Sequence, residues 1–466
     1  MSASEFSSGP RRFHFIGICG TAMGAVAGAM KRRGYEVTGS DASVYPPMST
    51  YLESTGIKLS SGYDAANIPA DTDVIVVGNA ISRGNPEAEQ ALRSKALYIS
   101  MPEILKQYFL RGKRNLVVTG THGKTTTTTL LTWILKNAGA DPGYLIGGIP
   151  KNFDGGANFT DSDFVVLEGD EYDTAFFDKR SKFLHYLPEV AIINNIEFDH
   201  ADIYDNLDQI LLTFSRLLRI VPDNGCIFAN GDDANCRKVV ANSPSPVVTV
   251  GLGESCDLRI TEIRYSAEGS YFKLGGTDFL VPMDGQFNVR NAAMAIAAAR
   301  FAGFDDATIR SGLESFTGIA RRQEVRGEVR GIKIIDDFGH HPTAILQAAE
   351  ALKRRYPEGR LWAVFEPRSN TTRRAIFQQD LVAALAEADG AIVAAVPDPA
   401  KFAPEDRLNP QQLVADVNAR GTESYFEDGV DAIIDRLKPL VKEGDTIVVF
   451  SNGGFDGIHG KLLERL

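Results

Sequence analysis

The chain has 466 residues and a formal net charge of −11 at pH 7, and 44% of its residues are hydrophobic. This length predicts about two to four globular domains, and the acidic balance argues against a nucleic-acid-binding protein, which usually carries a basic stripe. The four cysteines lack metal-like spacing and are interpreted as reduced thiols, and no apolar run is long enough to span a membrane. Residues 1–10 are polar, lack the apolar core of a signal peptide and are expected to fray, so a cytoplasmic protein is favoured.

The first part of the chain predicts a Rossmann-like βαβ unit. An apolar strand at 13–16 leads into a Gly-rich turn at 17–24 and an Ala-rich helix, and further strands are expected at 36–38 and 73–77. The glycine spacing is GxxGxxxG, whereas the dinucleotide-binding pattern is GxGxxG. Two interpretations therefore stay open: a tight turn without a ligand, or a turn that holds a diphosphate while Asp41 or its neighbours meet a ribose or base.

A phosphate-binding loop follows the next predicted strand, residues 115–119. Its sequence is Gly120-Thr121-His122-Gly123-Lys124-Thr125-Thr126, and a helix rich in Thr and Leu comes next. In such a loop the backbone N–H groups and the helix N-terminus bind phosphate oxygens, the lysine adds charge, and the Thr125 hydroxyl is placed to ligate Mg²⁺. The loop is shortened, because Val118 stands where the standard pattern has its first glycine. It predicts binding of a nucleoside triphosphate, with a purely structural turn as the alternative.

Acidic residues end the following two strands of this region. A buried strand at 164–167 runs into Glu168, where a Mg²⁺ ligand is needed beside a phosphate-binding loop. A strand at 190–194 runs into the segment 195–200, which ends in Asp199-His200, and a solvated acidic loop is the alternative there. Residues 247–283 alternate in polarity and predict a small antiparallel sheet.

A helix is expected next at 292–301. Asn288 and Asn291 precede it, and asparagines at a helix start are usually caps.

The last part of the chain predicts a doubly wound α/β domain. Strands at 333–335, 361–365, 391–396 and 446–450 each deliver polar residues at their carboxyl ends, where such a domain has its site. The pair His340-His341 follows the first of them. A zinc site is not expected there, because adjacent residues on one loop point apart and no cysteine or third histidine lies near in sequence.

Taken in order, five motifs of this chain resemble those of the Mur ligase family: the GTHGKTT loop, the Glu168 strand end, NIExDH, NxxN and DDFGHHP. The resemblance covers residues 13–466, and the family makes amide bonds in peptidoglycan precursors using ATP. It implies an α/β fold of three domains: an N-terminal Rossmann-like domain for the UDP substrate (1–112), a central P-loop ATPase-like domain (113–317) and a C-terminal Rossmann-like domain (318–466).

Four stretches, at 39–50, 168–183, 365–371 and 451–455, resemble one branch of the family. That branch joins UDP-N-acetylmuramate to the tripeptide L-alanyl-γ-D-glutamyl-meso-diaminopimelate in peptidoglycan recycling, and the branch that adds L-alanine to UDP-N-acetylmuramate is the alternative. The implied cofactors are ATP and Mg²⁺, and the implied partners are these two small substrates, without nucleic acid or membrane insertion. The oligomeric state is not readable from the sequence.

The resemblance also implies residue roles. The catalytic residues would be Lys124, Glu168 and His200. Thr125 and Glu168 would help hold one Mg²⁺, and His200 would ligate a second. The ATP-binding residues would be Gly120, Thr121, His122, Gly123, Lys124, Thr125, Thr126, Asn288, Asn291, Arg322 and Asp337. The UDP substrate would meet Gly17, Cys19, Gly20, Thr21, Met23 and Asp41. The peptide would meet Arg368, Asn370, Asn452 and Gly453.

The implied reaction passes through an acyl phosphate, because a carboxylate oxygen is a poor leaving group and its phosphorylation makes it a good one. The base that deprotonates the attacking amine is not identified, and His340 and His341 are weak candidates. Domain closure is expected, because ATP and peptide contacts come from different domains. Three other classes stay in view: an oxidoreductase, which would need GxGxxG and leave Lys124 without a role, a P-loop kinase or ATPase, and a non-catalytic scaffold.

Overall fold

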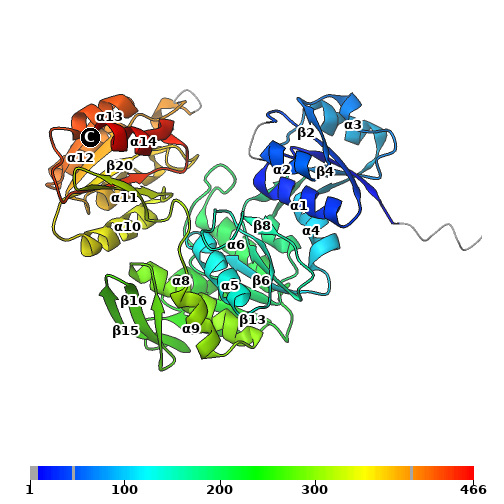
Figure 1. The fold of residues 1–466 in the computed structure, drawn as a ribbon, viewed down its shortest axis with the longest axis horizontal. Coiled ribbons are helices and arrows are strands. Elements are labelled where there is room, and N and C mark those ends of the chain that lie inside the picture. Colours follow the sequence, from blue (N-terminus) through cyan, green and yellow to red (C-terminus); the bar gives the residue numbers. More distant parts are fainter. Residues whose placement is uncertain (1–8, 45–47, 399–401) are drawn as a thin grey trace, which may run out of the picture.

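The structure, a computed structural model, describes residues 9–44, 48–398 and 402–466. Figure 1 shows three lobes, with the N-terminal and C-terminal lobes side by side above the central one. Each lobe contains a sheet of mainly parallel strands, so the expected α/β class with three domains is confirmed. Residues 1–8 of the segment expected to fray, and residues 45–47 of the stretch 39–50, lie outside the described residues.

The N-terminal sheet has five parallel strands in the order β3-β2-β1-β4-β5. Its elements are β1 (Arg12–Ile16), α1 (Thr21–Arg32), β2 (Glu36–Asp41), α2 (Met48–Ser54), β3 (Lys58–Ser61), β4 (Val74–Val77), α3 (Pro86–Ser94), β5 (Leu97–Ser100) and α4 (Met101–Leu105). Strands β1, β2 and β4 match the expected positions, although β2 continues to Asp41. The edge strands β3 and β5 were not predicted, because they are short and partly exposed.

The central sheet has ten strands in the order β17-β16-β15-β14-β13-β12-β6-β9-β7-β8. Its strands are β6 (Arg114–Thr119), β7 (Gly143–Leu145), β8 (Ala157–Asn158), β9 (Phe164–Glu168), β12 (Val190–Ile193), β13 (Cys226–Asn230), β14 (Val247–Gly251), β15 (Leu258–Ser266), β16 (Gly269–Leu274) and β17 (Thr277–Val281). Strands β10 (Asp173–Ala175) and β11 (Asp178–Ser181) form a separate hairpin. The helices are α5 (Lys124–Asn137), α6 (Leu207–Leu218), α7 (Ala234–Val240), α8 (Gln286–Ala302) and α9 (Asp306–Glu314).

Two expectations for the central domain are corrected. Strands β15–β17 are antiparallel as expected, but β14 pairs in parallel with β13 and β15, so the segment extends the central sheet and is not a sheet of its own. Helix α8 begins six residues earlier than expected, after Gly285, whose φ of 98° stops the helix. Asn288 and Asn291 therefore lie inside the helix and are not its caps.

The C-terminal sheet has six strands in the order β18-β19-β23-β20-β21-β22, and only the edge strand β18 is antiparallel. Its strands are β18 (Glu324–Val329), β19 (Ile332–Asp337), β20 (Leu361–Phe365), β21 (Gly390–Ala394), β22 (Glu423–Glu427) and β23 (Thr446–Phe450). Its helices are α10 (Pro342–Arg355), α11 (Gln378–Leu385), α12 (Pro410–Ala419), α13 (Val430–Leu437) and α14 (Ile458–Arg465). The four expected strands are present, with the two outer strands unpredicted.

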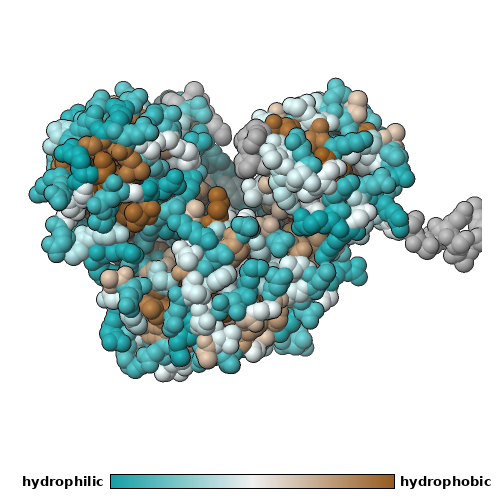
Figure 2. Space-filling view, viewed as in Figure 1, coloured by the Kyte–Doolittle hydropathy of each residue, from teal (hydrophilic) through white to brown (hydrophobic). Residues whose placement is uncertain are grey.

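The central and C-terminal domains meet at the segment 194–202, which follows β12. The hydroxyl of Thr343 donates to Glu197 at 2.7 Å, and the hydroxyl of Thr371 donates to Asp199 at 2.8 Å. Figure 2 shows a hollow between the two upper lobes, above the central domain. No helix among the described residues is both long and apolar enough to cross a bilayer.

Candidate active site

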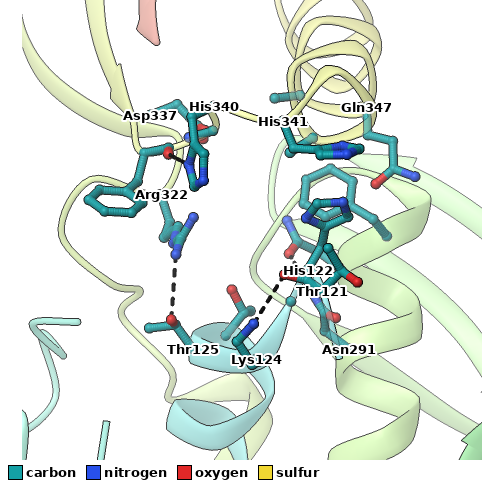
Figure 3. A pocket seen from close by; sticks show the side chains of 18 of the residues that line it. Thr121, His122, Lys124, Thr125, Asn291, Arg322, Asp337, His340, His341 and Gln347 are labelled. Atoms are coloured by element: carbon teal, nitrogen blue, oxygen red, sulfur yellow. Dashed lines mark hydrogen bonds between the residues drawn. The ribbon is translucent and has the colours of Figure 1, made fainter. Parts of the chain in front are cut away.

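A cavity of about 210 Å³ lies between the central and C-terminal domains. Ten of the eleven residues expected to bind ATP line it, all but Gly120: Thr121, His122, Gly123, Lys124, Thr125, Thr126, Asn288, Asn291, Arg322 and Asp337. Figure 3 shows Lys124 and Thr125 on one side of this cavity, and Asp337 and His340 on the opposite side. The residues come from separate domains, so their assembly depends on the contact between the two domains.

The phosphate-binding loop requires glycine at both of its glycine positions. Gly120 and Gly123 have φ values of 128° and 77°, which lie in the left-handed range that favours glycine. A Cβ on Gly123 would lie 2.3 Å from Oδ1 of Asn291 in helix α8. The loop therefore packs directly on α8, and α5 starts at Lys124 with its free N–H groups at the cavity.

Lys124 is held by the loop and by one carboxylate. Its Nζ donates to the carbonyls of Gly120 at 2.6 Å and Thr121 at 3.2 Å, and to Oε1 of Glu171 at 3.0 Å. Burial alone would lower the pKa of Lys124, but Glu171 and Asp170 raise it above its usual value. The lysine is therefore a cation in a low-dielectric site, where it attracts anionic oxygens strongly.

Glu171 also holds His200, since Nε2 of His200 lies 3.0 Å from Oε1 of Glu171. Burial favours the protonated carboxyl, yet Lys124 and His200 keep the pKa of Glu171 below its usual value. Burial works against the imidazolium too, but Glu171 raises the pKa of His200. Sequence analysis did not assign Glu171 to the site. Three acidic residues follow one another closely at 168–171, and the turn after β9 decides which of them faces Lys124.

The residues expected to ligate Mg²⁺ converge at the phosphate end of the cavity. Oε1 of Glu168 accepts a hydrogen bond from the Thr125 hydroxyl at 2.9 Å, and its Oε2 accepts one from the Gly147 N–H at 2.7 Å. Arg322 reaches the same hydroxyl at 3.4 Å. His200 lines the same cavity. A carboxylate and a hydroxyl beside a phosphate-binding loop fit Mg²⁺ that keeps several of its waters, and the imidazole of His200 is left for the second ion.

The other end of the cavity combines α8 with the end of β19. The side-chain amide of Asn288 donates to the Asp284 carbonyl at 2.7 Å. Asp337 accepts hydrogen bonds from the backbone N–H groups of Gln323 at 2.9 Å and Gly339 at 2.7 Å. Burial raises the pKa of Asp337 in spite of these bonds and of Arg322. Asn288 and Asp337 are thus fixed in position before any ligand arrives.

His341 is a poor candidate for the base that accepts the amine proton. Its Nδ1 accepts a hydrogen bond from the N–H of Thr343 at 3.3 Å, as the cap of α10, and its Nε2 donates to the Phe198 carbonyl at 3.3 Å. Burial lowers the pKa of His341 to about 4, so the imidazole is neutral at pH 7 but holds a proton weakly.

A second cavity, of about 600 Å³, lies at the carboxyl ends of the N-terminal strands. All six residues expected to meet the UDP substrate line it: Gly17, Cys19, Gly20, Thr21, Met23 and Asp41. Asp41 accepts a hydrogen bond from the Cys19 N–H at 2.9 Å, which fixes the Gly-rich turn. Burial and Asp41 both raise the pKa of the Cys19 thiol, so it is mostly protonated at neutral pH.

A third cavity, of about 440 Å³, shares lining residues with each of the first two. It shares Thr21, Ala22, Met101 and Lys182 with the N-terminal cavity. It shares Lys124, Gly147, Glu168 and His200 with the phosphate end of the ATP cavity. The three cavities therefore lie next to one another, in a row from the N-terminal domain to Lys124.

The residues expected to contact the peptide lie on two neighbouring loops of the C-terminal domain. A Cβ on Gly453 would lie 2.4 Å from Cδ of Arg368, so the arginine crosses directly over this glycine. Arg368 lies 3.7 Å from the carboxylate of Glu366. Asn370 instead points at the central domain, where its amide donates to Asp202 at 2.9 Å. The structure brings Arg368 and Gly453 together and places Asn370 at the domain interface.

Comparisons with known sequences cover nearly all of the chain. Residues 12–112 match the model of the Mur ligase family, catalytic domain, residues 118–299 that of the Mur ligase middle domain, and residues 321–453 that of the Mur ligase, glutamate ligase domain. An Escherichia coli protein named UDP-N-acetylmuramate–L-alanyl-γ-D-glutamyl-meso-2,6-diaminoheptandioate ligase is 43% identical over 98% of both chains. A UDP-N-acetylmuramate–L-alanine ligase from Syntrophus aciditrophicus is 32% identical over 98% of this chain and 94% of its own.

Among solved structures, a murein peptide ligase from Psychrobacter arcticus has the same fold, with a TM-score of 0.71. It is 36% identical, and the alignment covers 98% of each chain.

Proposed function

The chain belongs to the Mur ligase family, and we propose that within it the protein is the ATP-dependent ligase that joins UDP-N-acetylmuramate to L-alanyl-γ-D-glutamyl-meso-diaminopimelate, in peptidoglycan recycling. The observation that carries this proposal is the 43% identity, over 98% of both chains, to the E. coli ligase named for these substrates. The L-alanine ligase is less similar, at 32% identity. Diaminoheptandioate is another name for diaminopimelate.

The domain limits 1–112, 113–317 and 318–466 are part of this proposal. They are supported by the three matched segments, 12–112, 118–299 and 321–453, none of which crosses a limit. The N-terminal domain would bind the UDP part of the first substrate, the central domain would bind ATP, and the C-terminal domain would bind the peptide.

The reaction we propose has two steps. A carboxylate oxygen of the lactyl group attacks the γ-phosphorus of ATP, which forms an acyl phosphate and releases ADP. The α-amine of the peptide's alanine then attacks the acyl carbon, inorganic phosphate leaves, and the amine loses its proton. The arrangement of the three neighbouring cavities supports this mechanism, because it would let the lactyl group reach Lys124 while the uridine stays in the N-terminal domain.

Lys124 and Arg322 would stabilise the negative charge on the phosphoryl oxygens during transfer. Thr125 and Glu168 would hold one Mg²⁺ and His200 a second, and these ions would supply positive charge between the triphosphate and the substrate carboxylate. Asn288, Asn291 and Asp337 would position the nucleoside. Glu171 would keep Lys124 charged and His200 oriented until ATP binds, as its two 3.0 Å contacts suggest.

Phosphate release tests the proposal directly. The full chain is supplied with Mg²⁺, ATP and UDP-N-acetylmuramate, and either the tripeptide or L-alanine is added. Release that requires the tripeptide, with a product of matching mass, is expected. Phosphate release with L-alanine but not with the tripeptide would assign the chain to the other branch. If neither acceptor supports phosphate release, the substrate assignment is wrong. The variant Lys124→Ala, which loses the phosphate-binding charge, should release no phosphate with either acceptor.

A further inference from the structure

Two histidines and one glutamate lie together at the ATP cavity. His122, which is expected to bind ATP, and His341 line that cavity, and the proposed reaction assigns no chemical step to any of the three side chains. His122 belongs to the phosphate-binding loop, Glu197 follows β12, and His341 precedes α10 in the C-terminal domain. One ligand atom from each lies within 4.8 Å of the others. Figure 3 shows His341 above His122, and their ring centres are 4.5 Å apart. The fold therefore supplies the third ligand that is absent near His340-His341 in the sequence.

We propose that His122, Glu197 and His341 form a binding site for a zinc-class transition-metal ion that links the central domain to the C-terminal domain. Nε2 of His122 lies 3.2 Å from Oε2 of Glu197, and Nδ1 of His341 lies 3.5 Å from the same oxygen. Ligand atoms about 2.1 Å from a tetrahedral zinc ion are about 3.4 Å from each other, so these two separations suit such an ion with little movement.

The hydrogen bonds of His341 match those of a metal-binding histidine. A histidine that ligates a metal usually donates its second N–H to a carbonyl or carboxylate, which fixes the tautomer. In His341 the Nε2 proton goes to the Phe198 carbonyl, which leaves the lone pair of Nδ1 on the side of Glu197. Metal binding would replace the 3.3 Å hydrogen bond that Nδ1 accepts from Thr343 and the 3.2 Å hydrogen bond between His122 and Glu197. The hydroxyl of Thr343 holds Oε2 of Glu197 at 2.7 Å.

The site is accessible and chemically distinct from the Mg²⁺ site. His122 and Glu197 also line a cavity of about 200 Å³ on the far side of the loop, so an ion and a water ligand have room to enter. Mg²⁺ prefers oxygen ligands, whereas two imidazoles and one carboxylate favour zinc and its neighbours. A bound ion would tie the phosphate-binding loop to α10 and oppose separation of the two domains.

Cobalt titration of the full-length protein tests this site independently of any substrate. The protein is stripped with a chelator and titrated with Co²⁺ in the presence of millimolar Mg²⁺ and then with Zn²⁺. We expect one Co²⁺ per chain with the visible absorption of a four-coordinate ion, no thiolate charge-transfer band, and displacement by Zn²⁺. His341→Asn should weaken binding at least tenfold, while His340→Asn, the same change one residue earlier, should bind like the unchanged protein.

Asparagine at position 341 can still cap α10, and circular dichroism will show whether each variant folds. Glu197→Gln provides a second variant that should also lose at least tenfold in affinity. Equal binding by His341→Asn and His340→Asn, a thiolate band, or no stoichiometric binding by the unchanged protein would overturn the proposal.

Discussion

Replacing Glu171 with glutamine should destabilise the protein while improving metal-free nucleotide binding. The carboxylate of Glu171 is 3% exposed and lies 2.9 Å from Nζ of Lys124 and 3.0 Å from Nε2 of His200. Removing one partner of a buried ion pair costs about 3–5 kcal/mol, and we expect about 3 kcal/mol, because His200 can lose its proton once the carboxylate is gone. For the central domain, a loss of about 3 kcal/mol corresponds to a fall in Tm of about 6–12 °C.

Calorimetry of Glu171→Gln and of Asp141→Asn measures this effect against a matched change. Asp141 pairs with Lys136 at 2.7 Å, but its side chain is 61% exposed, so the same acid-to-amide change should cost less than about 0.5 kcal/mol there. In EDTA, the affinity of Glu171→Gln for ADP should rise by up to about tenfold, since Lys124 loses a competing acceptor. Equal Tm values for the two variants, or weaker ADP binding, would refute this account of Glu171.

Two further predictions concern the outer domains. Burial favours the protonated form of Glu87, but hydrogen bonds from His14 and other donors hold the pKa of Glu87 below its usual value of 4.5. The Glu87 carboxylate therefore stabilises the fold above pH 4.5, and this stabilisation is lost as the pH falls. Urea unfolding should therefore show Glu87→Gln about 2–3 kcal/mol less stable at pH 7 and a smaller gap at pH 4, whereas a constant gap would contradict the assignment. Gly453→Ala should displace the flexible Arg368 side chain, raise the KM for the tripeptide and leave the KM for ATP unchanged. In the control variant Gly454→Ala the added Cβ meets nothing within 4 Å, so neither KM should change. Equal kinetics for the two variants would count against Arg368 as a peptide contact.

The buried strands and the phosphate-binding loop were predictable from local sequence patterns. Strand β20 is apolar throughout, and β6 and β23 have apolar runs at 116–118 and 447–450, because both faces of a parallel sheet are covered by helices. The Gly120–Thr126 loop was recognisable for a similar reason, since its glycines, lysine and threonine are adjacent in sequence. The resemblance to the Mur ligases built on these motifs is confirmed by the matches along the chain.

The features that sequence patterns missed depend on neighbours far along the chain. The edge strand β22 has only one buried residue of five, so it lacks the apolar signal of an inner strand. Glu171 becomes the partner of Lys124 only because β9 lies next to β6 in the sheet. His122 and His341 are 219 positions apart and meet only at the interface of two domains, so no local spacing predicts their contact.

The segment after β12 limits how this protein can be recombined with its relatives. Asn195 accepts a hydrogen bond from the N–H of His122, while Glu197 and Asp199 bind residues of the C-terminal domain. A chimera that exchanges only residues 318–466 would separate Glu197 and Asp199 from Thr343 and Thr371. A functional hybrid would need residues 194–202 from the same parent as the C-terminal domain, so the unit of exchange is discontinuous in sequence.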